Sequence, residues 1–77
     1  MNRIGFFITD FRRKKNWTQS EFAKKLGVSQ QHVDQLEKGE LKYPIKTCRK
    51  LAKFLDGTEK QKMREALVNQ LLDELDN

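Results

Sequence analysis

The chain has 77 residues, of which 35% are charged and 36% hydrophobic, and this length suits one small domain with a single core. No segment reaches the apolar length of a membrane span. The apolar run that a signal peptide would need is interrupted by Thr9, Asp10 and Arg12. The single cysteine, Cys48, excludes an intramolecular disulfide and a cysteine-rich metal site. The net charge of +5 divides into a basic body, with 13 Lys and Arg against 5 Asp and Glu in residues 1–55, and an acidic tail, with 3 against 6 in residues 56–77.

From these features we expect a reducing, cytoplasmic compartment, no membrane contact, no metal and no cofactor. The uneven charge favours a polyanion bound through the basic body and some other partner bound through the acidic tail. A charged surface that serves only solvation would have the same composition, so charge alone does not decide between the two readings.

The first predicted helix runs from about Asn2 to Lys15. Basic residues from Arg12 onward gather near its C-terminal end, where cations complement the helix dipole. Trp17 follows in the connecting turn, and we expect it to fill the core between helices rather than to offer an exposed stacking surface. The apolar residues that recur at helical spacing, and so predict one core-facing side, are Ile4, Phe7, Ile8 and Phe11.

The segment from Thr18 to Glu37 predicts two short helices joined by a tight turn. Thr18 and Glu21 have the spacing of a capping box at the start of the first helix. Gly27 lies where the chain leaves that helix and needs a positive φ, and Ser29 is placed to cap the second helix. The residues expected to face inward are Phe22, Ala23 and Leu26 in the first helix and Val33 and Leu36 in the second.

The outward side of the second short helix is polar but mostly uncharged. A surface that serves only solubility more often carries Lys and Glu. A glutamine amide matches the acceptor and donor that adenine presents in the major groove of DNA. The residues on this side are Gln30, Gln31, His32, Asp34 and Gln35.

A loop with Gly39 precedes a fourth helix, which we expect to begin at Pro44 because its fixed φ suits the first helical position. We expect Cys48 in this helix to be a small buried apolar group, not a nucleophile or a ligand. The apolar residues that keep the helical period here are Ile45, Cys48, Leu51, Ala52 and Leu55.

A fifth helix is predicted from about Glu59 to Asp76, started by a second capping box of Thr58 and Gln61. Its apolar stripe is broader than one edge of a small domain needs, and it contains Met63, Ala66, Leu67, Val68, Leu71, Leu72 and Leu75. The part expected to meet a second copy of the chain is Leu67, Leu71, Leu72 and Leu75. The alternative is that the whole stripe folds back onto the core.

The order and spacing of these residues resemble the helix-turn-helix of the lambdoid phage repressors and Cro proteins, and more broadly of Cro/CI-type bacterial regulators. The resemblance covers about residues 8–55 and is carried by Thr18-Gln19, Ala23, Leu26-Gly27-Val28-Ser29-Gln30 and Gln35-Leu36-Glu37 followed by Gly39. A plain helical hairpin with the same caps is the alternative.

This resemblance implies an all-α, lambda-repressor-like DNA-binding domain, built as a compact bundle of five helices. Residues 1–77 would form a single domain, with the motif at about residues 18–38. The helix at about residues 59–76 would be a candidate dimerisation element.

The resemblance also implies the residues of a DNA interface, in which the second helix of the motif enters the major groove. Those expected to contact base edges are Gln30, Gln31, His32 and Gln35. Those expected to contact the sugar-phosphate backbone are Asn16, Thr18, Gln19, Lys38, Lys42 and Tyr43. Gln19 opens its helix, where free N–H groups favour a phosphate.

Two further pairs of residues compare with the lambdoid proteins in opposite ways. Arg12 and Glu37 match a family ion pair that joins the first helix to the end of the second motif helix, and unpaired surface charges are the alternative. Tyr43 and Ile45 stand where the phage proteins carry arginines, so insertion of a cation into the minor groove is not implied here.

Together these features predict a sequence-specific regulator of transcription that binds double-stranded DNA as a homodimer on a pseudo-palindromic operator, in a bacterial cell or a phage-infected host. A phage Cro-like repressor is the first expectation, and a restriction-modification controller protein is compatible. The alternative is an antitoxin or another protein-interaction module whose acidic last helix covers a protein partner. An enzyme is not expected, because one His and one Cys on different predicted helices form no nucleophilic site.

Overall fold

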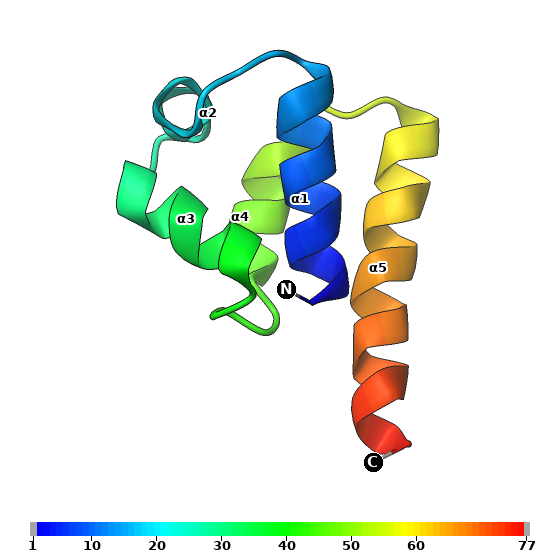
Figure 1. The fold of residues 1–77 in the computed structure, drawn as a ribbon. Helices are drawn as coiled ribbons and strands as arrows, with labels where there is room; N and C mark the ends of the chain where they lie inside the picture. The colour runs from blue at the N-terminus through cyan, green and yellow to red at the C-terminus, as the bar shows by residue number, and fades with distance from the viewer. Residues whose placement is uncertain (1, 77) are drawn as a thin grey trace.

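The computed structural model describes residues 2–76, and within that range the chain forms five α-helices and no strand (Figure 1). The helices are α1 (Arg3–Lys14), α2 (Gln19–Leu26), α3 (Gln30–Lys38), α4 (Ile45–Ala52) and α5 (Gly57–Leu75). The predicted all-α fold with five helices is confirmed. None of the helices in the described range is both long and apolar enough to cross a membrane.

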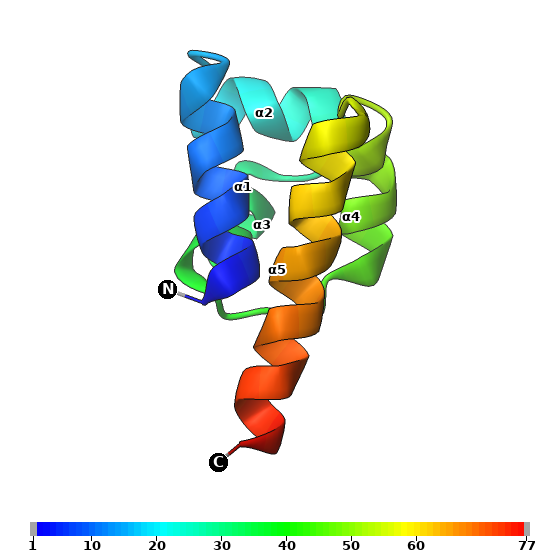
Figure 2. The ribbon, with the colours of Figure 1, turned by 90° about the vertical axis from the view of Figure 1, so that its right-hand side faces the viewer.

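The helices enclose one core. α1 and α5 lie side by side and run in opposite directions, and the C-terminal turns of α5 extend past the other helices (Figures 1 and 2). The buried apolar residues come from all five helices and from the turn after α4; they are Ile4, Ile8, Phe11, Phe22, Ala23, Leu26, Val33, Leu36, Cys48, Leu51, Leu55 and Met63.

The N-terminal turns of α1 pack closely against the end of α3. A Cβ atom on Gly5 would lie 2.8 Å from the backbone carbonyl oxygens of both Leu36 and Glu37. The two helix backbones therefore approach to a distance that only glycine permits at this position. This contact fixes the C-terminal end of α3 on α1.

The ends of the motif helices follow the sequence signals. The Thr18 hydroxyl accepts from the Glu21 amide at 3.0 Å, and the Glu21 carboxylate accepts from the Thr18 amide at 3.0 Å, which confirms the predicted capping box. Gly27 has a left-handed φ of +71°, and the Ser29 hydroxyl accepts from the His32 amide at 3.0 Å. The ends of the two motif helices are thus set by contacts over three or four residues.

The starts of the last two helices differ from the sequence prediction. Pro44 is the cap residue before α4 rather than its first helical residue, because its ψ of +66° lies outside the helical range. The predicted capping box of Thr58 and Gln61 is wrong. Asp56 caps α5 instead, accepting from the Glu59 amide at 2.8 Å while Glu59 accepts from the Asp56 amide at 3.0 Å. Aspartate is at least as good a cap as threonine, and it precedes Thr58 in the chain.

Two predictions about single side chains are confirmed. Trp17 packs edge-on against Phe11 and is stacked on Phe22, with ring centroids 5.9 Å apart in both pairs, so it fills the space between α1 and α2. Cys48 is buried among the apolar side chains, and this burial raises the pKa of its thiol to about 11.

The core uses only part of the apolar stripe on α5. Met63 is buried, and Ala66 and Leu67 pack against the core. The remaining residues of the stripe are exposed by about half or more, and they are Val68, Leu71, Leu72 and Leu75. The alternative in which the whole stripe folds back onto the core is therefore wrong.

Candidate nucleic-acid interface

The predicted base readers lie on α3, three of them in its first turn. Val33 and Leu36 on the inner side of this helix are completely buried, and they fix its rotation about its own axis. Gln30 and Gln31 are exposed at the first two helical positions, and Gln35, one turn after Gln31, is half-buried. The structure thus presents two amide side chains at the start of a helix whose opposite side is packed into the core.

His32, the remaining predicted reader, contacts a neighbouring helix. Its Nε2 atom lies 3.0 Å from the hydroxyl oxygen of Thr47, which is buried in the first turn of α4. The imidazole is half-buried and joins the start of α3 to the start of α4. It therefore differs from Gln30 and Gln31, which are exposed.

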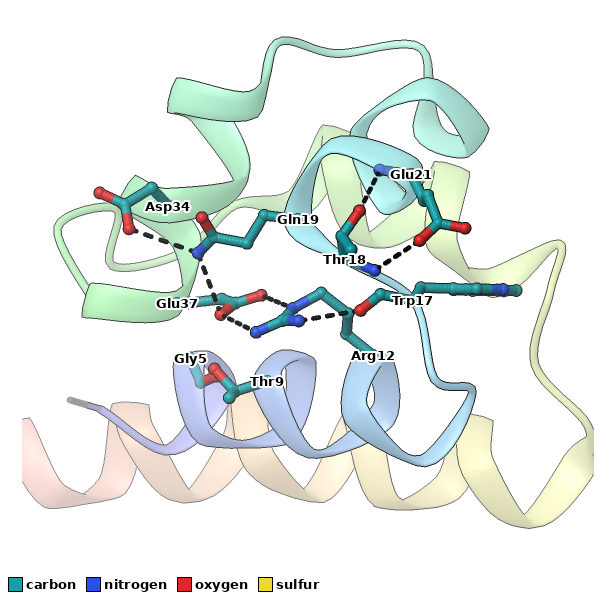
Figure 3. Close-up of polar contacts among 9 residues, drawn as sticks. All are labelled: Gly5, Thr9, Arg12, Trp17, Thr18, Gln19, Glu21, Asp34 and Glu37. Atoms are coloured by element: carbon teal, nitrogen blue, oxygen red, sulfur yellow. Dashed lines mark hydrogen bonds and ion pairs between the residues drawn. The ribbon is translucent and has the colours of Figure 1, made fainter.

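Gln19 and Glu37 lie in a polar network that joins three helices (Figure 3). The Gln19 amide nitrogen lies 3.3 Å from a carboxylate oxygen of Asp34 and 3.3 Å from one of Glu37. Arg12 donates to both oxygens of Glu37, at 2.6 and 3.1 Å, and also to the carbonyl oxygen of Trp17 at 2.9 Å. The network connects α1, the following turn, the start of α2 and the end of α3, and so orients the two motif helices relative to α1.

Asn16 and Thr18 both lie exposed just before α2. Asn16 has a left-handed φ of +61°, a conformation in which asparagine is enriched, so the turn itself explains its residue type. The Thr18 hydroxyl accepts a hydrogen bond as a helix cap, and a hydroxyl in that role still has one proton to donate.

The predicted DNA-backbone contacts at the end of α3 and in the loop that follows it are exposed, and each of them is paired with a carboxylate. The Lys38 ammonium lies 2.8 Å from Asp34, and the Lys42 ammonium lies 3.1 Å from Glu74. The Tyr43 hydroxyl donates to the other oxygen of Glu74 at 2.6 Å, which raises the pKa of Tyr43 to about 12. The same hydrogen bond, together with the Lys42 charge, lowers the pKa of Glu74.

The role of Gln70 was not predicted from the sequence. This residue is buried on α5, where its side-chain oxygen accepts from the Ile4 amide at 3.1 Å and its amide group donates to the Lys42 carbonyl oxygen. It thereby holds both the first turn of α1 and the loop that follows α3. A glutamine seven residues after Met63, on the core-facing side of the helix, was the available signal.

Lys46 is a further candidate contact that was not predicted from the sequence. An open depression between the start of α3 and the loop before α4 has His32, Lys42, Tyr43, Lys46 and Thr47 in its lining. Lys46 is exposed in the first turn of α4. Two lysines, a tyrosine and an imidazole of the first turn of α3 thus line one depression, in a composition that suits an anionic ligand.

Comparisons with known proteins point to one class of protein. A family model described as helix-turn-helix matches residues 8–61. An uncharacterized HTH-type transcriptional regulator of Methanocaldococcus jannaschii is 46% identical over 44 residues, which cover 57% of this chain and 67% of that protein. None of the solved structures matches the chain significantly.

Proposed function

This chain belongs to the Cro/CI-type helix-turn-helix family of DNA-binding transcriptional regulators, and on that premise we propose that it is a repressor, similar to phage Cro proteins, that binds a pseudo-palindromic operator as a homodimer. It acts by occupying promoter DNA, without catalysis. The single observation that carries the proposal is the exposed pair Gln30 and Gln31 at the start of α3.

Base reading by α3 is supported by the way this helix is held. Its inner side is buried and its C-terminal end is held by the Arg12–Glu37 ion pair, so the orientation of α3 in the domain is fixed while Gln30 and Gln31 remain exposed. In helix-turn-helix proteins this end of the second helix contacts base edges in the major groove. A bidentate contact between a glutamine amide and adenine contributes about 1–3 kcal/mol of discrimination. Gln35 and His32 are proposed to add contacts deeper along the same helix.

Contact with the DNA backbone is proposed for residues just before α2 and at its start, at the end of α3 and in the loop that follows α3. The start of α2 offers backbone N–H groups and the positive end of a helix dipole beside Gln19. Lysine has three N–H donors, so an ion pair with one carboxylate leaves donors for a phosphate. The other residues proposed for this role are Asn16, Thr18, Lys38, Lys42 and Tyr43.

Dimerisation is proposed through the exposed apolar side of α5. Leu67, Val68 and Leu71 line an open apolar depression with Tyr43 and Ile45 of the loop and of α4. Leu72 and Leu75 extend the exposed apolar surface toward the C-terminal turns, which protrude from the bundle (Figure 2). A second copy would remove this surface from water, and its position beside the loop of Lys42 keeps the two DNA-contacting loops close to the two-fold axis.

The docking of a protein partner on the acidic end of α5 has less support. Asp73 pairs with Arg3 at 2.6 Å, and Glu74 binds Lys42 and Tyr43. Two of the three acidic side chains at that end are therefore engaged within the chain.

The decisive experiment is the selection of bound sites from random duplex DNA, combined with sedimentation of the protein alone and on the selected site. We expect enrichment of two-fold symmetric sites whose half-site centres lie about 34–36 Å apart, and a mass of two chains per site. Selection that enriches no sequence would contradict base reading. Binding of one chain to a single half-site, with a monomer in free solution at micromolar concentration, would contradict the dimer.

A further inference from the structure

Glu74, near the end of α5, binds both side chains of the α3–α4 loop that are proposed to contact DNA phosphates. One carboxylate oxygen accepts from the Tyr43 hydroxyl at 2.6 Å, and the other lies 3.1 Å from the Lys42 ammonium. A phosphate group of DNA also offers two acceptor oxygens that share one negative charge. The carboxylate thus binds the same two side chains that a phosphate would contact.

The number of protons on each donor decides whether the Glu74 carboxylate and a DNA phosphate can bind that donor at the same time. The Tyr43 hydroxyl has one proton, and a DNA phosphate has only acceptors, so Tyr43 serves either Glu74 or a phosphate at any moment. Lys42 has three N–H donors and can contact both, but its charge is then partly neutralised by the carboxylate. DNA therefore competes fully for Tyr43 and partly for Lys42.

Glu74 is kept beside the loop by other contacts of the same helix. Gln70, one turn earlier, binds the Lys42 carbonyl oxygen and the Ile4 amide. Asp73 receives two hydrogen bonds from Arg3, at 2.6 and 3.2 Å. These contacts anchor α5 to α1 and to the loop, so the carboxylate stays at a high effective concentration next to Lys42 and Tyr43.

From this arrangement we propose that Glu74 is an intramolecular competitor of DNA, which lowers the affinity for every duplex sequence by occupying Tyr43 and neutralising Lys42. The inference rests on the proposed function, because it needs these two side chains at the DNA backbone. Phosphate contacts do not depend on sequence, so Glu74 weakens specific and non-specific binding alike and leaves the preference of α3 for its site unchanged.

The exposure of the Lys42 and Glu74 side chains limits how far Glu74 lowers the affinity for DNA. The side chains of Lys42 and Glu74 are 71% and 40% exposed, so water and salt screen their attraction. Exposed ion pairs of this kind correspond to a factor of about two to five in an equilibrium constant. Glu74 is therefore a modulator of affinity and not an absolute block.

The test compares the unmodified chain of residues 1–77 with its Glu74→Ala variant on random duplex DNA over a range of salt concentrations. We expect Glu74→Ala to bind about two- to fivefold more tightly at low salt, with a steeper salt dependence, because Lys42 then releases a counterion more fully. Glu74→Gln removes the charge but keeps an acceptor for Tyr43, so we expect a smaller gain. Thermal melting of each variant verifies that the fold is retained.

Two controls separate the local contact from the general change in charge. Asp76→Ala removes the same charge two residues later, at the end of α5, and we expect it to change affinity less than Glu74→Ala does. In a Lys42→Ala/Tyr43→Phe background, replacement of Glu74 by alanine should give no further gain.

Equal or weaker binding by Glu74→Ala, with an unchanged salt slope, would overturn the inference. A gain that persists in the Lys42→Ala/Tyr43→Phe background would overturn it as well, because it would come from long-range charge. Failure of the proposed function has a different signature: neither the wild type nor Glu74→Ala would then select any DNA sequence. If the wild type selects an operator and Glu74→Ala gains nothing, the competitor alone is refuted.

Discussion

Arg12 of α1 and Glu37 at the end of α3 form an ion pair with two parallel hydrogen bonds, and the two side chains are only 14% and 7% exposed. Removal of two charges from water costs about as much as their attraction returns, so such a pair adds little net stability. Its consequence lies in orientation, because it holds the helix that carries Gln30 and Gln31 at one angle to α1.

The ion pair leads to the first prediction. Arg12→Ala should lower the free energy of unfolding by about 3 kcal/mol, because it leaves a buried carboxylate unpaired. Arg13→Ala, an exposed neighbour on the same helix, is the control and should change it by less than about 0.5 kcal/mol. The double variant Arg12→Met/Glu37→Leu should recover most of the loss. Urea unfolding measures all three, and a loss for Arg12→Ala no larger than that for Arg13→Ala would contradict the prediction.

A second prediction compares two glycines. Gly5→Ala should destabilise the fold by about 1–3 kcal/mol, because its Cβ would meet backbone oxygens of α3 at 2.8 Å and backbone cannot move aside cheaply. Gly57→Ala at the start of α5 meets nothing within 4 Å and should stabilise the fold by about 0.4–1 kcal/mol. Thermal melting checks the pair, and equal melting temperatures for the two variants would refute the close approach of α1 and α3.

A third prediction concerns base reading. Gln31→Ala should weaken binding to the selected operator by about 1–3 kcal/mol and leave binding to random duplexes nearly unchanged, because it removes a base contact and no charge. Gln30→Ala should behave in the same way. Gln61→Ala, an exposed glutamine on α5, is the control and should affect neither affinity. Equal losses on operator and random DNA would show that Gln31 does not read bases.

The fourth prediction tests the proposed dimer surface without disturbing the core. Leu71→Glu places a charge on the exposed apolar side of α5, where the side chain is 49% exposed, and should convert the proposed dimer to a monomer. Phe54→Glu changes a residue of similar exposure, 42%, in the turn before α5 and should leave the dimer intact. Sedimentation at micromolar concentration distinguishes them. Operator affinity should fall steeply for Leu71→Glu but not for Phe54→Glu. If both variants remain dimers, the interface lies elsewhere.

The fifth prediction follows from the raised pKa of Cys48. With a pKa of about 11 in the folded protein, the thiol stays protonated at pH 8, whereas an unfolded cysteine with a pKa of about 8.5 is partly ionised. Alkylation by iodoacetamide at pH 8 should therefore be at least about a hundredfold slower in the folded protein than in urea. Rapid alkylation of the native protein would contradict the burial of Cys48.

The same raised pKa makes the free energy of unfolding depend on pH. The thiol loses its proton at a lower pH in the unfolded state than in the folded state. The contribution of the protonated Cys48 thiol to the free energy of unfolding is therefore fully present below about pH 8.5 and is lost as the pH rises through 11. Cys48→Ala should lack this pH-dependent contribution.

The sequence alone determined the features that depend on neighbours within three or four residues. The capping box of Thr18 and Glu21, the left-handed turn at Gly27 and the buried pair Val33 and Leu36 all follow from local hydrogen bonds and helical periodicity. These features suffice to predict the all-α class and the helix-turn-helix. The Arg12–Glu37 pair was expected from the resemblance to Cro/CI-type proteins, since nothing in its 25-residue separation indicates it.

Tertiary structure decided the contacts between residues that are far apart in the chain. Glu74 binds Tyr43 across 31 residues, and Gln70 binds the Lys42 carbonyl across 28. The contact of His32 with Thr47 depends in the same way on the placement of α4 against α3. Local propensity fixes where a helix begins and ends, but the packing of complementary side chains in one core fixes how the helices lie against each other. Only that packing brings a carboxylate of the last helix to the loop beside α3.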